Sequence, residues 1–141
     1  MDDLLLSELR RDEGVVPHAY QDHLGYWTIG VGRLIDKRKG GRLTDEEIDY
    51  LLQNDVDRFK TELDARLSWW RTLDEVRQRV IVNMAFNLGV TGLLGFRNTL
   101  AHVKAKQWDK AAAGMLASKW AKQVGKRADR LAAMMRLGVA P

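Results

Sequence analysis

The sequence predicts a mostly helical protein with one small antiparallel β-sheet near its N-terminus. Two segments, beginning at Thr44 and Thr72, open with a Thr-x-x-Glu capping box and continue with apolar residues at helical spacing. Between residues 17 and 35, aromatic and β-branched residues are interrupted by glycines, which is typical of short strands joined by tight turns. The length of 141 residues and the hydrophobic fraction of 45% indicate one globular domain.

The first helix is expected over residues 3–12, because its leucines recur on one face. Gly14 is the type of residue that ends a helix, since it adopts the left-handed conformation without a steric penalty. Pro17 then favours extended geometry in the residue before it. The chain therefore leaves the helix directly for the sheet between residues 17 and 35.

Thr44 opens a helix whose apolar positions continue for roughly 22 residues. A helix of this length suits a connection between two lobes. We expect an N-terminal lobe at about 13–43, a connecting helix at about 44–66 and a C-terminal helical lobe at about 72–141, with an active-site cleft between the lobes. Residues 3–12 are expected to pack on the C-terminal lobe.

Thr72 and its capping box predict the next helix, which is apolar nearly all round and is therefore expected to be the central core helix. Gly89 is expected to end it. Further helices are predicted at residues 108–116 and 126–137. The tryptophans after the connecting helix are expected to pack rather than to bind a ligand, Trp69 and Trp70 as a pair that packs the lobes, and Trp108 and Trp120 in the core.

The charge is unevenly distributed. Residues 97–141 contain ten Lys/Arg and two Asp/Glu, a net charge of +8, whereas the whole chain carries +4. A basic C-terminal part suits a polyanionic partner such as nucleic acid, an acidic membrane surface or a cell-wall polymer.

Several classes of chemistry and location are disfavoured. The chain has no cysteine, and its three histidines are not spaced as a metal-binding pair, so no disulfide, metal or cofactor is expected. No stretch approaches the roughly 18 apolar residues of a membrane span, so stable membrane insertion is not expected. The opening residues lack the long apolar region of a signal peptide.

Two carboxylates, Glu13 and Asp22, lie in contrasting local environments. Glu13 is expected at the C-terminal end of the first helix, where the helix dipole and any loss of solvation raise the pKa of a carboxyl group, as a general acid requires. Asp22 is expected in a polar turn, where it stays ionised. Carboxylates whose environments separate their pKa values are the pattern of glycoside hydrolysis.

The surrounding motif is more specific than the pair. Glu13 is followed by eight residues, Asp22, five residues and Thr28, and Thr28 lies inside the hairpin sequence "GYWTIGVG". This arrangement resembles the phage-type lysozymes, endolysins related to the T-even phage enzyme in glycoside hydrolase family twenty-four. The resemblance covers nearly the whole chain, because three later stretches also match the family in order: "LTDEEIDYLLQNDVD", "AFNLGVTGLLGFRNTL" and "QWDKAAAGM".

The resemblance implies a muramidase, which hydrolyses the β-1,4 bond between N-acetylmuramic acid and N-acetylglucosamine in peptidoglycan. It assigns Glu13 as the general acid. Asp22 matches the residue that activates a water or stabilises positive charge on the sugar, and Thr28 matches a hydroxyl that helps to hold that water. The implied reaction inverts the anomeric centre, without a metal or cofactor.

Further residues follow from the same resemblance. Leu34, Phe86 and Thr99 match sugar-contacting positions. Gly114 stands where the family has an asparagine, so one sugar contact is expected to be lost. Arg127 matches an arginine that the family places beside the catalytic glutamate, where its charge opposes the effect of the helix end.

The resemblance also implies a setting. The expected partner is bacterial peptidoglycan rather than nucleic acid, and a monomer is expected. The protein is expected to wait in the host cytoplasm until a holin gives it access to the periplasm and cell wall at lysis. A virion-associated or prophage lysozyme would have a similar sequence.

Two alternatives remain open. A lytic transglycosylase would cleave the same bond without water, although the presence of Asp22 and Thr28 favours hydrolysis. A non-catalytic basic module that binds nucleic acid would explain the charge of residues 97–141, but not the spacing of Glu13, Asp22 and Thr28.

Overall fold

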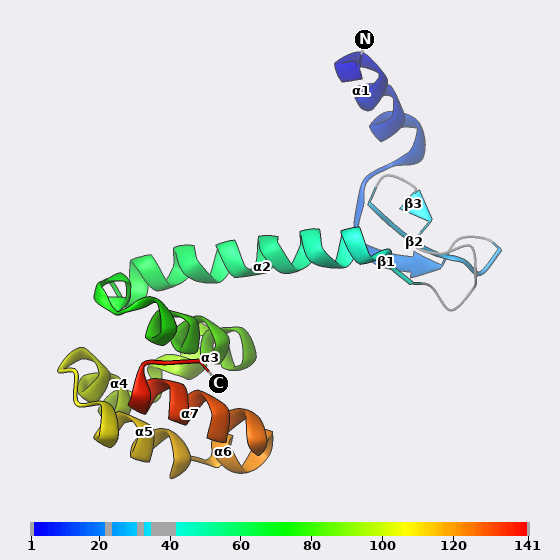
Figure 1. Cartoon of the computed structure of the whole chain (residues 1–141). Coiled ribbons are helices and arrows are strands. Elements are labelled where there is room, and N and C mark those ends of the chain that lie inside the picture. Colours follow the sequence, from blue (N-terminus) through cyan, green and yellow to red (C-terminus); the bar gives the residue numbers. More distant parts are fainter. Residues whose placement is uncertain (1, 22–23, 31–32, 35–41, 141) are drawn as a thin grey trace. The chain divides into compact units, whose positions relative to one another are not determined.

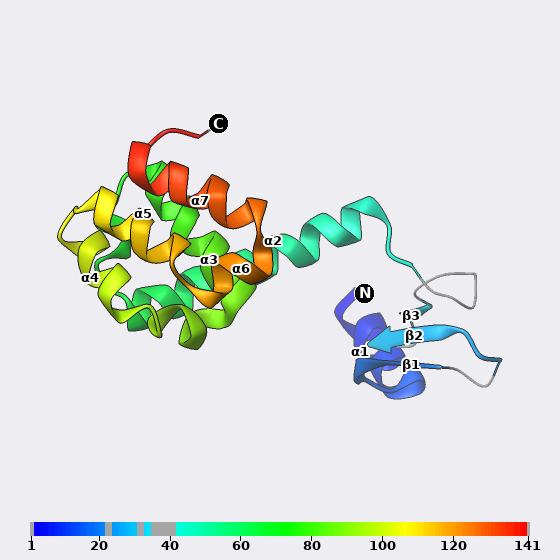
Figure 2. The same cartoon turned by 90° about the horizontal axis from the view of Figure 1, so that it is seen from below.

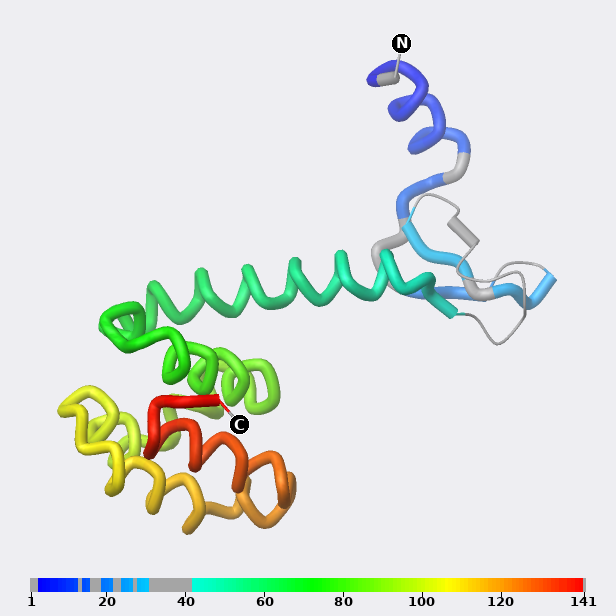
Figure 3. Tube along the Cα trace, viewed as in Figure 1, coloured from blue at the N-terminus to red at the C-terminus, as the bar shows by residue number. Residues whose placement is uncertain are grey.

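The computed structural model describes residues 2–21, 24–30, 33–34 and 42–140, and Figure 3 traces the course of the chain. The described residues are mostly helical with one small antiparallel sheet, so the predicted fold class is confirmed. The elements follow in the order α1 (Asp2–Glu13), β1 (Val16–Gln21), β2 (Trp27–Gly30), β3 (Arg33–Leu34), α2 (Asp45–Arg66), the 3-10 helix η1 (Trp70–Thr72), α3 (Glu75–Leu94), α4 (Arg97–Lys104), α5 (Trp108–Leu116), α6 (Lys119–Val124) and α7 (Lys126–Leu137). The chain divides into two compact units, residues 1–51 and 52–141.

The first unit contains α1 and the sheet, whose strand order is β1-β2-β3 with both pairs antiparallel (Figure 1). Helix α1 ends where predicted, because Gly14 has a φ of +77° and donates its N–H to the carbonyl of Arg10 at 3.0 Å. The chain then enters β1, which pairs with β2 through an irregularity between Val16 and Tyr20.

Helix α1 keeps its apolar side exposed within this unit. Leu4 is 71% exposed, and Leu5, Leu6 and Leu9 are 46%, 57% and 42% exposed. The expected packing of residues 3–12 on the C-terminal lobe stays a prediction.

Helix α2 begins with the predicted capping box. The N–H of Thr44 donates to Oε1 of Glu47 at 2.8 Å, and the N–H of Glu47 donates to Oγ1 of Thr44 at 3.2 Å. These two bonds satisfy backbone donors that have no partner inside the helix. At the other end of α2, Leu63 is fully buried in the core of the second unit.

The predicted cap of α3 at Thr72 is wrong. Thr72 ends the 3-10 turn η1, and its hydroxyl donates to the carbonyl of Trp69 at 2.6 Å. Leu73 is then extended and 6% exposed, so burial of its side chain interrupts the helical path, and α3 starts at Glu75. Asp74 is the N-cap, and its carboxylate accepts the N–H of Arg77 at 3.1 Å. Burial raises the pKa of Asp74, but hydrogen bonds from the backbone and side chain of Arg77 outweigh it and lower that pKa below its ordinary value.

Helix α3 is the core helix, as predicted, and Gly89 interrupts it. Val80, Ile81, Met84 and Ala85 are each at most 1% exposed. Gly89 has a φ of +75° and a ψ of 156°, which breaks the helical path before further helical turns continue to Leu94. Helices α3 to α7 form one helical bundle (Figure 2).

Two of the predicted core tryptophans are almost fully buried. Trp70 is 1% exposed and Trp120 is 4% exposed. Each buried indole N–H has an acceptor at 2.8 Å, Asp64 Oδ1 for Trp70 and Asn87 Oδ1 for Trp120. These side chains therefore bury a large apolar area without leaving a polar group unsatisfied.

No single helix in the described part of the chain is long and apolar enough to cross a membrane. Among the described helices, only α3 and α4 taken together meet the length and composition expected of a span, and they are bent by 106° at the break between them.

Candidate active site

Thr28 occupies the centre of the N-terminal sheet. It lies on β2, opposite Tyr20 of β1 and Leu34 of β3. Its side chain is 5% exposed, and its hydroxyl donates to the backbone carbonyl of Tyr26 at 3.2 Å. Because a hydroxyl has one proton and two lone pairs, this bond leaves the Thr28 oxygen as an acceptor for a further hydrogen bond.

The other predicted residues of this unit are placed by the backbone alone. Glu13 is the last residue of α1, as expected, and its side chain lies outside the described part of the structure. Leu34 pairs with Thr28 across β2 and β3, and its side chain is likewise outside the description. Asp22, which follows the last residue of β1 in the sequence, lies outside the described residues.

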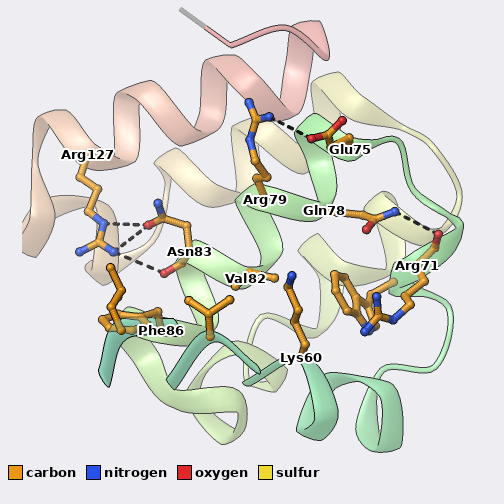
Figure 4. A pocket seen from close by; sticks show the side chains of 12 residues that line it. Lys60, Arg71, Glu75, Gln78, Arg79, Val82, Asn83, Phe86 and Arg127 are labelled. Atoms are coloured by element: carbon orange, nitrogen blue, oxygen red, sulfur yellow. Dashed lines mark hydrogen bonds and ion pairs between the residues drawn. The ribbon is translucent and has the colours of Figure 1, made fainter. Parts of the chain in front are cut away.

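The second unit contains a pocket of about 510 Å³ whose lining comes from α2, η1, α3 and α7 (Figure 4). Phe86 and Arg127, two of the predicted site residues, both line it. Apolar side chains, among them Val56 and Val82, line the same pocket as Phe86. The pocket also has four cationic lining residues and one acidic one: Lys60, Arg71, Arg79, Arg127 and Glu75.

Phe86 is held by an aromatic contact on one side. Its ring centroid lies 5.4 Å from that of Phe59 on α2, with the rings tilted by 54°. This geometry is within the range that aromatic pairs favour. Phe86 remains 40% exposed, so part of its apolar surface is open to a ligand.

Arg71, at one edge of the pocket, is paired with a carboxylate. Its Nε donates to Asp64 Oδ1 at 2.7 Å and its Nη2 donates to Asp64 Oδ2 at 3.2 Å. The hydrogen bond from Arg71, together with the one from the Trp70 indole, lowers the pKa of the Asp64 carboxyl. The charge of Arg71 is therefore compensated locally.

Arg127 is held by an amide instead. Its Nε and Nη2 both donate to Asn83 Oδ1, at 3.0 Å and 2.7 Å, and Nη2 also lies 3.4 Å from the backbone carbonyl of Asn83 (Figure 4). The contact joins the first turn of α7 to the exposed side of α3.

Each unit offers its own chemical groups. In the first unit Thr28 offers a hydrogen-bond acceptor, and in the second unit Phe86 offers an apolar face and Arg127 offers a positive charge. Among the described residues, no group of three or more His, Asp or Glu is arranged to hold a metal ion.

A family model for phage lysozyme matches residues 10–136, which is most of the chain and includes every predicted site residue. The chain belongs to the phage lysozyme family. It is therefore a glycoside hydrolase that acts on peptidoglycan. The family assignment made from the spacing of Glu13, Asp22 and Thr28 is confirmed.

Individual phage lysozyme relatives are similar at moderate identity. A probable T4-type lysozyme of Dictyostelium discoideum is 27% identical over 156 aligned positions, which cover 92% of each chain. The pre-baseplate central spike protein Gp5 of Enterobacteria phage T4 is 30% identical over 155 positions, which cover 92% of this chain and 27% of the spike protein. An endolysin of Acyrthosiphon pisum secondary endosymbiont phage 1 is 28% identical over 114 positions, covering 81% of this chain and 75% of the endolysin.

Thr99 and Gly114, two positions that the phage lysozyme resemblance singles out, lie against each other. Thr99 is on α4 and is 7% exposed. A Cβ added at Gly114 on α5 would overlap Thr99 Oγ1 and would lie 3.5 Å from Thr99 Cβ. The threonine side chain therefore takes space that a side chain at position 114 would need. Packing against Thr99 requires the glycine, and the glycine also lacks the polar side chain of the asparagine expected here.

Asn83 is one of several pocket residues that the sequence did not single out, and it is the one that contacts Arg127. Its signal was an isolated asparagine within the apolar run "VIVNMAF" of the core helix. A polar residue in such a run lies on the side of the helix that faces solvent or a partner. Its partner could not be found from the sequence, because Arg127 is 44 positions away.

We expect the effect of Gly114→Ala on the free energy of unfolding to change sign with the residue at position 99. In the wild-type background, overlap with Thr99 outweighs the higher helix propensity of alanine, and the free energy of unfolding falls by about 1 kcal/mol. In a Thr99→Ala background the overlap is absent, and the same substitution raises the free energy of unfolding by about 0.5–1 kcal/mol. Urea unfolding of the four proteins measures both effects, and an equal effect in both backgrounds would contradict the packing argument.

Proposed function

We propose that this phage lysozyme is a muramidase that hydrolyses the β-1,4 bond between N-acetylmuramic acid and N-acetylglucosamine. The observation that carries the proposal is the Glu13–Asp22–Thr28 spacing, in a chain that the family model matches from residue 10 to residue 136. The position of Thr28, buried on the central strand with its hydroxyl proton already donated, supports a role in holding water.

In the proposed reaction, Glu13 donates its proton to the glycosidic oxygen as the bond between that oxygen and the anomeric carbon breaks. Asp22 accepts a proton from a water, whose oxygen forms the new bond to the anomeric carbon from the opposite face. The product is inverted, which requires about 6.5–9.5 Å between the two carboxyl groups to leave room for the water. Thr28 accepts a hydrogen bond from the same water and so orients its lone pair toward the sugar.

The other residues are proposed to act on substrate binding and charge. The exposed part of the Phe86 ring suits the apolar face of a sugar, and Leu34 is proposed to contact the substrate from the hairpin. Arg127 is proposed to act beside Glu13, where its charge stabilises the carboxylate that forms when Glu13 gives up its proton. Thr99, which is 7% exposed, is proposed to contact the sugar through its hydroxyl.

We expect Glu13→Gln and Asp22→Asn each to reduce lysis by about 100-fold or more, because each removes a proton-transfer group while keeping side-chain size. The measurement is the loss of turbidity of outer-membrane-permeabilised Gram-negative cells. Circular dichroism and thermal unfolding must match wild type, so that lost activity is not lost folding.

Glu13→Gln protein that lyses cells at the wild-type rate would end the assignment of the general acid. If folded wild-type protein gave no lysis, the chain would have kept the lysozyme fold for binding. Retardation of DNA with a steep salt dependence would then support the basic binding module.

Product analysis distinguishes hydrolysis from transglycosylation. We expect every cleavage of purified peptidoglycan to create one new reducing end, and cleavage in oxygen-18 water to incorporate one labelled oxygen. NMR of fresh products should show the α-anomer first if the reaction inverts. Anhydro-muramic products without the label would instead identify a lytic transglycosylase.

We further propose that the protein acts as a monomer in the host cytoplasm and needs a holin to reach the wall. Expressed alone in Escherichia coli, it should accumulate without lysing cells, and expression of a holin should cause rapid lysis. Sedimentation equilibrium should give one species of 16.1 kDa. Lysis without a holin, or a stable dimer, would contradict the corresponding part of this proposal.

A further inference from the structure

The contact between Asn83 and Arg127 fixes the plane of the guanidinium. Two N–H groups on one edge of Arg127 converge on a single amide oxygen, at 3.0 Å and 2.7 Å (Figure 4). The guanidinium is planar, so two such bonds restrain its rotation as well as its position. The Nη1 group takes no part in these bonds.

Arg127 also differs in charge from the two other arginines that line the pocket, Arg71 and Arg79, because both of those pair with carboxylates. Five other arginines of the second unit pair with carboxylates, at distances between 2.7 Å and 3.7 Å: Arg58 with Asp55, Arg66 with Glu62, Arg71 with Asp64, Arg77 with Asp74, and Arg79 with Glu75. Within the described ranges, no carboxylate pairs with Arg127. Asn83 thus provides the geometry of a carboxylate partner without its negative charge.

We propose that Asn83 is a positioning residue of the lysozyme reaction, which holds Arg127 in a fixed orientation and leaves its positive charge uncompensated. The inference rests on the proposed role of Arg127 beside the general acid. A cation there is useful only if its charge is not neutralised, because it stabilises the carboxylate that appears as the proton is transferred. A neutral acceptor therefore suits this position better than aspartate.

Asn83→Asp tests the charge of Arg127 separately from the orientation of its guanidinium. The substitution keeps the side-chain shape and the acceptor oxygens, so Arg127 stays in place and the stability of the protein is kept or increased. The charge is now compensated, so kcat should fall about tenfold or more while KM changes less than about twofold. The assay measures reducing ends released from soluble peptidoglycan fragments.

Asn83→Leu tests the geometry. It removes the acceptor and releases the guanidinium, and kcat should again fall about tenfold. In an Arg127→Gln background, both Asn83 substitutions should have little further effect, because they act through a group that is no longer present.

Asn87→Asp is the matched control. Asn87 lies one helical turn further along α3, and its Oδ1 accepts the Trp120 indole N–H at 2.8 Å, outside the pocket lining. The same substitution there should leave kcat unchanged and affect at most stability.

The proposal fails if folded Asn83→Asp and Asn83→Leu proteins keep the wild-type kcat, if only KM changes, or if their effects persist in full without Arg127. These results are distinct from a failure of the proposed function, in which wild-type protein itself releases no reducing ends.

Discussion

The second unit depends on one buried cation. Arg77 is 9% exposed, and it donates from Nε to the carbonyl of Met135 at 2.6 Å and from Nη2 to that of Arg136 at 3.0 Å. It also pairs with Asp74 at 3.1 Å, and its guanidinium lies 3.8 Å from the ring centre of Trp108. A buried charge must be fully paired, so this side chain ties the start of α3 to the start of α5 and the end of α7.

The same two helices meet again at the pocket. The start of α3 contacts the end of α7 through Arg77, and the middle of α3 contacts the start of α7 through Asn83 and Arg127. The first contact is buried and its charge is compensated, as a structural contact requires. The second is more exposed and its charge is uncompensated within the described residues. The Arg77 contact therefore holds α3 and α7 together at one end of the helix pair, and at the other end Arg127 keeps an uncompensated positive charge.

Local sequence rules were sufficient for much of this fold. The capping box at Thr44, the glycine end of α1 and the break at Gly89 each depend on residues within a few positions of one another. The capping-box prediction failed at Thr72, because burial of Leu73 interrupts the helical path and Asp74 is then the first residue that can cap α3. Burial of a neighbour is a tertiary effect that a capping pattern does not contain.

The sequence by itself determined the fold class and the family, and it supplied the spacing on which the roles proposed for Glu13, Asp22 and Thr28 rest. Only the tertiary structure decided that Asn83 holds Arg127, that Thr99 lies against Gly114, and that a buried arginine joins α3 to α7. The physical reason is the separation along the sequence of the residues in contact. Hydrogen bonds within a helix or hairpin join residues close in sequence, whereas these three contacts join residues that only packing brings together.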